Sequence, residues 1–392
     1  MFELAILKLT AFCNLDCKYC YMFNLEDKTF SRVGRQMPLP TSLTALDRVC
    51  EHVEVHGAKR FHVTLHGGEP TLWPEPSFRA FFDRVEAIRD QGLDLSLSMQ
   101  TNGYRINPRL LRLFSDHQVT IGVSIDGPRE YNDAARVNHS GAGTYERVMS
   151  TVTSILEGDQ GDVLRGFLSV ADPRIPPSTY LDWADSLPIR RLDVLWPMDF
   201  NHMNPPWPEG GETAYAQTPL YGTWFAELFE DWWRRDDPTL YIRFFYDCLS
   251  HYLGSTEHIE NIVNDTVPIA VVNTDGQFEY HDYFRGAFDG ATRSPFNVIT
   301  HGFDDLLNDA TFNYLLHLHQ FLPTECSACP VRSICGGGFL PGRVDATGLP
   351  PHRRSVLCHD QLFFFERFHD LIAPWLDRAG ATIHSSDYTP VC

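Results

Sequence analysis

The 392-residue chain has few basic residues and no long apolar segment. Lys and Arg total 32 against 51 Asp and Glu, which gives a formal net charge of −19 at pH 7, and no Lys/Arg-rich run occurs. Because a surface of this sign repels phosphate groups, we expect no nucleic-acid partner. No apolar run reaches bilayer length, and Met1 to Leu4 lack the basic start of an export signal, so we expect a cytoplasmic protein without a membrane partner.

The ten cysteines are unevenly distributed, and 43% of the residues are hydrophobic, enough for a large core and more than one domain. In a chain without an export signal, cysteines are metal ligands or buried thiols rather than disulfides, because the cytosol keeps thiols reduced. Seven of the ten form two groups along the sequence. The other three, Cys50, Cys248 and Cys392, stand alone and receive no predicted role.

Short apolar or β-branched segments alternate with amphipathic ones over the first half of the chain. The predicted strands are Leu4–Leu9, Arg60–His66, Leu93–Gln100, Val119–Ile125, Leu164–Val170 and Leu192–Trp196, and predicted helices include Ser42–Val55, Ser77–Asp90 and Tyr145–Glu157. This alternation predicts an α/β fold in which a parallel sheet, covered by helices, curves into a partial (β/α)6 TIM-like barrel. Ligands bind such folds at the carboxyl ends of the strands.

Cys13, Cys17 and Cys20 follow the first predicted strand with the spacing C-x3-C-x2-C. Three thiolates can hold three irons of a 4Fe–4S cluster and leave the fourth iron open to a ligand. Zinc remains an alternative, although no fourth Cys or His lies nearby in sequence. With Tyr19 before the last cysteine, the motif resembles the signature of radical S-adenosylmethionine (SAM) enzymes. The resemblance implies that the open iron binds SAM, which is cleaved to a hydrogen-abstracting 5′-deoxyadenosyl radical.

Polar motifs at the ends of the next three predicted strands resemble the SAM contacts of that family. The predicted contacts are Tyr19, Gly67, Gly68, Glu69, Pro70, Gln100, Asn102, Ser124, Asp126 and Arg136. In the resemblance, the Gly-Gly-Glu-Pro element binds the methionyl amine of SAM, Ser124 the ribose and Arg136 the carboxylate. From the residues alone, paired glycines permit close backbone approach and a carboxylate can accept hydrogen bonds from an ammonium group.

The second cysteine group consists of Cys326, Cys329, Cys335 and Cys358. A zinc ribbon is one interpretation of these four residues. Placed after a radical SAM core, they resemble the SPASM domain, which carries auxiliary 4Fe–4S clusters. His281 and Phe339 stand where that pattern has further cysteines. The resemblance therefore implies two 4Fe–4S clusters in all, one that binds SAM and one closed auxiliary cluster, served by an electron donor such as flavodoxin or ferredoxin.

The resemblance covers nearly the whole chain. It predicts a radical SAM partial barrel over residues 1–218, a helical bridge over 219–264, a SPASM-type domain over 265–360, and a C-terminal helix and tail over 361–392. It finds no separate peptide-recognition domain before the core, so we expect a leader peptide to be bound by the core or by another protein.

Asp282 occupies the position of an acidic residue that acts as general base in sulfatase-maturing relatives. An N-cap or turn aspartate is the alternative. The residues around Cys335 and Cys358 resemble maturases of ribosomally made peptides that build cyclophane crosslinks. We therefore expect a peptide maturase that joins a residue of a precursor peptide to an aromatic side chain. The alternatives are oxidation or epimerisation of a residue, and a non-catalytic metal-binding scaffold.

Overall fold

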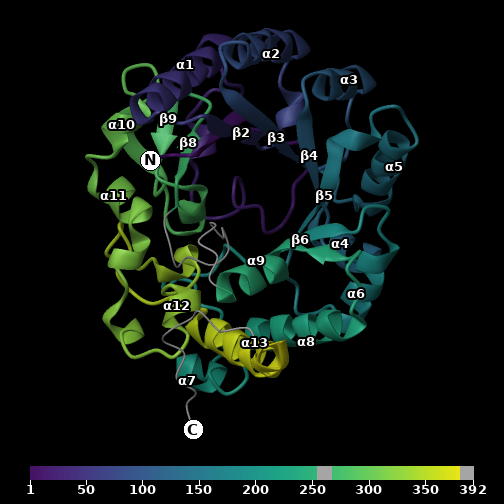
Figure 1. Ribbon diagram of the computed structural model, residues 1–392, viewed down its shortest axis with the longest axis vertical. Coiled ribbons are helices and arrows are strands. Elements are labelled where there is room, and N and C mark those ends of the chain that lie inside the picture. Colours follow the sequence, from purple (N-terminus) through teal and green to yellow (C-terminus); the bar gives the residue numbers. More distant parts are fainter. Residues whose placement is uncertain (254–266, 380–392) are drawn as a thin grey trace. The chain divides into compact units, whose positions relative to one another are not determined.

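The computed structural model describes residues 1–253 and 267–379 (Figure 1). The chain forms two compact units. The first unit comprises Met1–Ile125, Arg129–Phe167 and Pro268–Asn313, and the second comprises Asp126–Pro128, Leu168–Val267 and Tyr314–Cys392. Cys392 and the ends of the predicted bridge and tail lie outside the described residues. The four predicted domain ranges stay a prediction, and the structure groups residues 268–313 with the amino-terminal strands.

The first unit is built on a largely parallel sheet. Its central strands are β1 (Leu4–Thr10), β2 (Arg60–Gly67), β3 (Asp94–Thr101) and β4 (Val119–Ser124). β8 (Ile269–Val272) pairs in parallel with the other edge of β1, and β9 (Gln277–Glu279) and β10 (Arg293–Asn297) extend that side as antiparallel strands. The strand order in this unit is therefore β10-β9-β8-β1-β2-β3-β4.

Helices cover the outer face of these strands (Figure 1). They are α1 (Leu39–His56), α2 (Glu75–Arg89), α3 (Pro108–Asp116), α5 (Tyr145–Leu156) and α10 (Phe303–Leu306). α4 (Arg129–Ala135) follows the end of β4 and contacts α5, and its Ala135 carbonyl oxygen accepts from the Lys18 amide in the loop after β1. α1, α2 and α3 each have a proline at the first or second helical position, namely Pro40, Pro76 and Pro108. A proline suits this position because its fixed φ is helical and its missing amide would have no partner in the first turn.

The second unit contains the short strands β6 (Arg191–Leu195) and β7 (Tyr241–Ile242), which pair in parallel. Its helices are α6 (Pro177–Ser186), α7 (Gly211–Tyr215), α8 (Leu220–Arg235), α9 (Arg243–Tyr252), α12 (Arg332–Cys335) and α13 (Cys358–Ala379). Phe229 of α8 packs against Phe368 of α13 with ring centroids 4.7 Å apart. Aromatic side chains thus form the core of this helical layer.

Two elements, β5 (Leu164–Val170) and α11 (Ala310–Leu316), begin in the first unit and end in the second. The remaining short 3-10 helices are Thr29–Ser31, Pro70–Leu72, Gly161–Val163, Asp282–Gly286, Leu318–Gln320, Thr324–Cys326 and Leu340–Arg343. None of the helices that the structure describes combines the length and the apolar character needed to cross a membrane.

All six predicted strands are present, with ends that differ from the prediction by at most one residue. The predicted fold class, an α/β partial barrel followed by a smaller Cys-rich region, is confirmed. The sequence pattern did not predict β8, β9 and β10, because each is five residues or shorter and carries little periodicity. These three strands place Asp282, which follows β9, in the same unit as the first cysteine loop.

Candidate active site and metal centres

The first three predicted metal ligands, Cys13, Cys17 and Cys20, lie in the loop that follows β1, and each is half-buried. The Cys20 amide donates to the Cys17 carbonyl oxygen at 3.0 Å, which closes a turn between the last two cysteines. The amide of Asp16 donates to the Val137 carbonyl oxygen at 2.8 Å. Backbone hydrogen bonds therefore help to hold the loop in place, and the Cys13 sulfur also accepts from the Leu15 amide at 3.4 Å.

The electrostatics of these thiols fit a cationic ligand. Burial raises the pKa of the Cys13 thiol to about 12, and the charges of Glu69 and of the other two cysteines add to the effect. Burial and the neighbouring Cys17 likewise raise the pKa of Cys20 to about 11. Because ligating thiols must be deprotonated, a positively charged metal group is needed to stabilise three thiolates here.

The spacing of the thiols fits a cluster better than a single ion. Four ligands bound tetrahedrally to zinc at about 2.3 Å lie about 3.8 Å apart. In residues 1–253 and 267–379, one group has three His, Cys, Asp or Glu side chains whose ligand atoms all lie within 4.8 Å of one another. That group contains no cysteine. At least two of the three loop sulfur atoms therefore lie more than 4.8 Å apart, which is wider than one zinc ion requires and is compatible with thiols that bind different irons.

Gly67 and Gly68 bring the end of β2 against the backbone of the cysteine loop. Gly67 has φ +132°, and a Cβ there would lie 2.5 Å from the Thr10 carbonyl oxygen. A Cβ at Gly68 would overlap the Phe12 carbonyl group. The two glycines thus allow the end of β2 to pack closely against the backbone of Thr10 and Phe12. Pro70 begins the 3-10 helix that follows.

Glu69 is buried, and its carboxylate accepts four hydrogen bonds from the protein. Oε1 accepts from the Thr71 amide at 3.1 Å, from the Thr71 hydroxyl at 2.6 Å and from the Thr101 hydroxyl at 2.7 Å, and Oε2 accepts from the Asn102 amide at 2.8 Å. Oε1 accepts three of these bonds and Oε2 only one, so Oε2 keeps a lone pair for a further donor. Glu69 therefore joins the ends of β2 and β3, and its direct contact with an ammonium group stays a prediction.

Three further predicted contacts lie at the same edge of the first unit. The Gln100 side chain on β3 donates to the Ser124 hydroxyl at the end of β4, at 2.8 Å. The Asn102 side chain donates to the Asn14 side-chain oxygen at 2.7 Å and lies 3.4 Å from the Cys13 sulfur. The structure therefore places Asn102 against the cysteine loop and joins Gln100 to Ser124, while their contact with SAM stays a prediction.

Arg136 is buried, and its guanidinium donates to the Tyr19 hydroxyl at 2.8 Å. Its positive charge also acts to lower the pKa of Cys20, against the larger effect of burial. Arg136 is therefore a fixed cation beside the cysteine loop rather than a surface residue. Asp126 belongs to the second unit, where its carboxylate accepts from the Val170 amide at 3.0 Å.

Asp282 is buried among charged groups of the first unit. Its carboxylate forms an ion pair with the Lys8 ammonium and accepts a hydrogen bond from the Tyr21 hydroxyl at 3.2 Å. Although burial acts to raise it, Lys8 and then Arg285 hold the pKa of the Asp282 carboxyl well below its usual range. Asp282 is thus an ionised carboxylate linked to Tyr21, the residue directly after Cys20.

His281, not Asp282, is the N-cap of the 3-10 helix Asp282–Gly286, where its Nδ1 accepts from the Tyr283 amide at 3.1 Å. Its Nε2 is buried and has no hydrogen-bond partner within the described part of the chain. Burial lowers the pKa of His281 to about 4. The imidazole is therefore neutral at pH 7, and the N-cap alternative for Asp282 is wrong.

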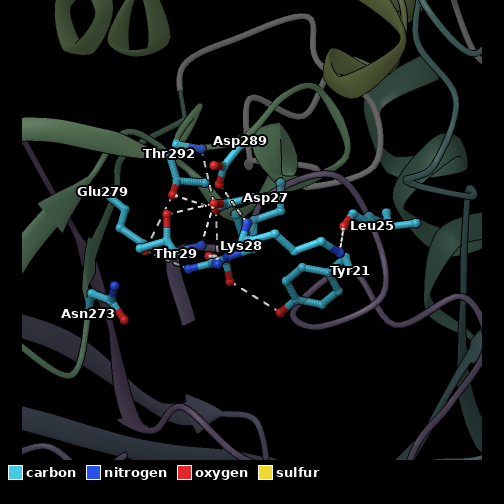
Figure 2. Close-up of polar contacts among 12 residues, drawn as sticks. Tyr21, Leu25, Asp27, Lys28, Thr29, Asn273, Glu279, Asp289 and Thr292 are labelled. Carbon is cyan, nitrogen blue, oxygen red and sulfur yellow. Dashed lines mark hydrogen bonds and ion pairs between the residues drawn. The ribbon is translucent and has the colours of Figure 1, made fainter. Parts of the chain in front are cut away.

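The ion pair of Asp282 belongs to a larger buried network that sequence reasoning missed. Lys8 also pairs with Glu279, whose other oxygen accepts from Arg285 at 2.5 Å. Arg285 reaches Asp27 at 3.1 Å. Figure 2 shows Asp27 surrounded by its hydroxyl partners, Thr29 at 2.6 Å and Thr292 at 3.1 Å.

One signal in the sequence could have revealed the network. Lys8 lies within the apolar strand that ends at Thr10, and a charged side chain on such a strand must find a partner when it is buried. The identity of that partner could not be read from the sequence, because Glu279 and Asp282 are more than 270 residues away.

The second cysteine group lies in the second unit. Cys326, Cys329, Cys335 and Cys358 all line one pocket, together with Gly337 and Gly338. Burial raises the pKa of the Cys335 thiol well above its usual value, and the other three cysteines add to the effect. The four thiols thus converge on one enclosed space, as a closed cluster would require.

Comparisons with known proteins agree with this geometry. The Radical SAM superfamily matches residues 7–164. A serine-type anaerobic sulfatase-maturating enzyme of Bacteroides thetaiotaomicron is 22% identical over 390 residues, covering 94% of this chain and 88% of that protein.

Solved structures share the fold. The structure of native anSMEcpe with bound AdoMet and Cp18Cys peptide matches with a TM-score of 0.78 at 19% identity, covering 96% of this chain and 99% of that chain. Streptococcus suis SuiB bound to the precursor peptide SuiA matches with a TM-score of 0.58 at 14% identity, covering 91% and 76%. At these identities the likeness shows the α/β partial barrel with its C-terminal region.

Proposed function

Residues 7–164 are a radical SAM domain, and we propose that the chain modifies a residue of a ribosomally made precursor peptide. In the proposed reaction, a side-chain carbon loses a hydrogen and forms a carbon–carbon bond to an aromatic side chain of the same peptide, a cyclophane-type crosslink. Oxidation of a side chain is the second candidate, favoured by the similarity to a sulfatase-maturating enzyme. The match to SuiB, whose structure holds a precursor peptide, supports a peptide substrate in either case.

The residues fit the cofactors of such an enzyme. Cys13, Cys17 and Cys20 would hold the SAM-binding 4Fe–4S cluster, and the four cysteines of the second unit would hold the auxiliary one. Arg136, fixed by Tyr19, would pair with the SAM carboxylate. When bound, these groups supply electron transfer and the 5′-deoxyadenosyl radical that abstracts hydrogen. A donor such as flavodoxin or ferredoxin would provide the electron.

The observation that carries the proposal is the buried Asp282 carboxylate, hydrogen-bonded to the residue after the last loop cysteine. Forming a crosslink removes two hydrogens from the peptide. One would leave as a hydrogen atom to the 5′-deoxyadenosyl radical, and the other as a proton with an electron that the auxiliary cluster would accept. With its pKa held low by Lys8 and Arg285, Asp282 is a weak base that accepts protons only from strong acids. When a carbon radical has added to an aromatic ring and the adduct has lost an electron, the ring is a cation and therefore such an acid.

Epimerisation places a different demand on the site, because a hydrogen atom must be returned to the substrate. A thiol, with its weak S–H bond, is the side chain suited to this step. Outside the cysteine loop, the one thiol in the described residues of the first unit is Cys50, on the outer helix α1. The geometry of this unit therefore favours removal of hydrogen over its replacement.

The first experiment separates an enzyme from a metal-binding scaffold. Anaerobically reconstituted protein is mixed with SAM and a chemical reductant, and 5′-deoxyadenosine is measured. We expect its release. A chain that holds iron but neither binds nor cleaves SAM would contradict the proposal.

The second experiment identifies the product. A short peptide encoded beside the gene is added, and the product is examined by mass spectrometry. We expect the loss of two hydrogens and fragments joined by a carbon–carbon bond. The same mass loss without a crosslink would show side-chain oxidation, and an unchanged mass with deuterium uptake at an α-carbon would show epimerisation.

A further inference from the structure

Two histidines and an aspartate form a cluster at the edge of the first unit opposite the cysteine loop. His52 contacts Phe2, which precedes β1, whereas Cys13 follows the other end of that strand. The seven residues of β1 separate the two places by roughly 20 Å. The cluster therefore lies outside the proposed reaction site.

The side chains of this cluster come from two neighbouring helices, α1 and α10 (Figure 1). His52 and His56 lie four residues apart on α1, so they share one helix face. Oδ1 of Asp304, on α10, lies 3.0 Å from Nδ1 of His52 and 2.7 Å from Nε2 of His56. The three potential ligand atoms all lie within 4.8 Å of one another.

We propose that His52, His56 and Asp304 bind one divalent transition-metal ion, for which Zn²⁺ is the appropriate probe. Two imidazoles and a carboxylate are typical zinc ligands. Ligands bound tetrahedrally at about 2.0–2.1 Å lie about 3.3 Å apart. The observed separations of 3.0 and 2.7 Å therefore need to widen by about 0.3 and 0.6 Å to admit the ion.

The surroundings of His52 support metal binding through Nδ1. Its Nε2 lies 3.2 Å from the Phe2 carbonyl oxygen, to which it can donate a hydrogen bond. This leaves the Nδ1 lone pair free to face the ion, an arrangement common for metal-binding histidines. The His52 side chain is fully buried, whereas those of His56 and Asp304 are 30% and 39% exposed, so the remaining coordination position opens to water.

A different tautomer describes the cluster without metal. Nε2 of His52 also lies 3.1 Å from the Phe2 amide, from which it can accept, while its Nδ1–H donates to Asp304. This alternative needs no ion and predicts no response to zinc. A bound ion would instead fasten α1 to the segment Pro268–Asn313, which also carries Asp282.

The test uses holoprotein whose iron sites are already filled, so that the cysteines do not compete for zinc. Zinc per chain is measured by equilibrium dialysis, and the unfolding temperature is measured with and without Zn²⁺. The variants are His56→Gln and Asp304→Asn. His117→Gln is the matched control, because His117 pairs with a single carboxylate, that of Glu86, at 2.9 Å.

The wild type and the control should each bind about one zinc ion and unfold at a higher temperature when it is present, by the linkage of binding to folding. Loss of a residue that only hydrogen-bonds to a metal ligand weakens metal binding by roughly 10–100-fold. Because His56→Gln and Asp304→Asn each remove a ligand itself, each should weaken zinc binding by more than this. Equal zinc responses in all four proteins, or no response in the wild type, would overturn the proposal. Neither readout depends on the proposed peptide reaction.

Discussion

Replacing Glu69 with Gln removes one of the two carboxylate oxygens that join the ends of β2 and β3. The Thr71 amide donates to Oε1 and the Asn102 amide to Oε2, and two threonine hydroxyls also donate to Oε1. A Gln side chain has one acceptor oxygen. It can therefore accept from one of the two amides but not from both, whichever way the amide group is turned.

The magnitude follows from the group left without a partner. The hydroxyls can rotate and accept from the new NH₂ group, but one buried backbone amide loses its acceptor, which costs about 1–3 kcal/mol. Burial raises the pKa of Glu69, so the wild type carries a desolvation cost that Gln avoids. We therefore expect a net loss of about 1–2 kcal/mol, and a larger loss for Glu69→Ala, which leaves all four donors unpaired.

The assay compares anaerobically reconstituted variants by unfolding temperature and by SAM binding in equilibrium dialysis. A loss of this size lowers the unfolding temperature by about 2–8 °C for a unit of this length. Glu75→Gln is the control, because Glu75 forms only a surface ion pair with Arg79 and should shift the temperature little. An unchanged unfolding temperature in Glu69→Gln would refute this reasoning, and lost SAM binding beside it would show that the carboxylate acts on SAM rather than on the fold.

Three further outcomes are expected. Changing Cys13, Cys17 and Cys20 together to Ala should lower the iron content from about eight to about four per chain and abolish 5′-deoxyadenosine release. Zinc in the second cysteine site, or about twelve irons per wild-type chain, would contradict the assignment of two clusters. Asp282→Asn should still release 5′-deoxyadenosine but yield no modified peptide, because the proton acceptor is lost; product formed at the normal rate would remove this role. The pKa of His281 is about 4 in the folded chain and about 6.5 in the unfolded chain. Below about pH 6.5, the unfolded chain therefore binds a proton that the folded chain does not, which favours unfolding. Wild-type stability should therefore fall as pH drops from 6.5 to 5, and His281→Gln should flatten that slope in urea unfolding; an identical slope would show that His281 titrates normally.

The sequence alone determined the features that depend on neighbouring residues. The strands from Leu4 to Trp196 were predictable because a buried strand needs apolar residues at regular positions, and its pattern is complete within a few residues. The spacing of Cys13, Cys17 and Cys20 is similarly local, because one loop carries all three thiols. Such features require no knowledge of how distant segments pair.

Only the tertiary structure decided which groups meet across the chain. The partners of Lys8 became visible once β8 and β9 were added beside β1, which places Glu279 and Asp282 against a strand from the opposite end of the sequence. The hydrogen bonds of Glu69 could not be predicted for a related reason: two of their four donors lie at the end of β3, more than 30 residues away. Charge pairing and hydrogen-bond saturation depend on distances in space, and those distances are set by strand order, which no local pattern in this sequence records.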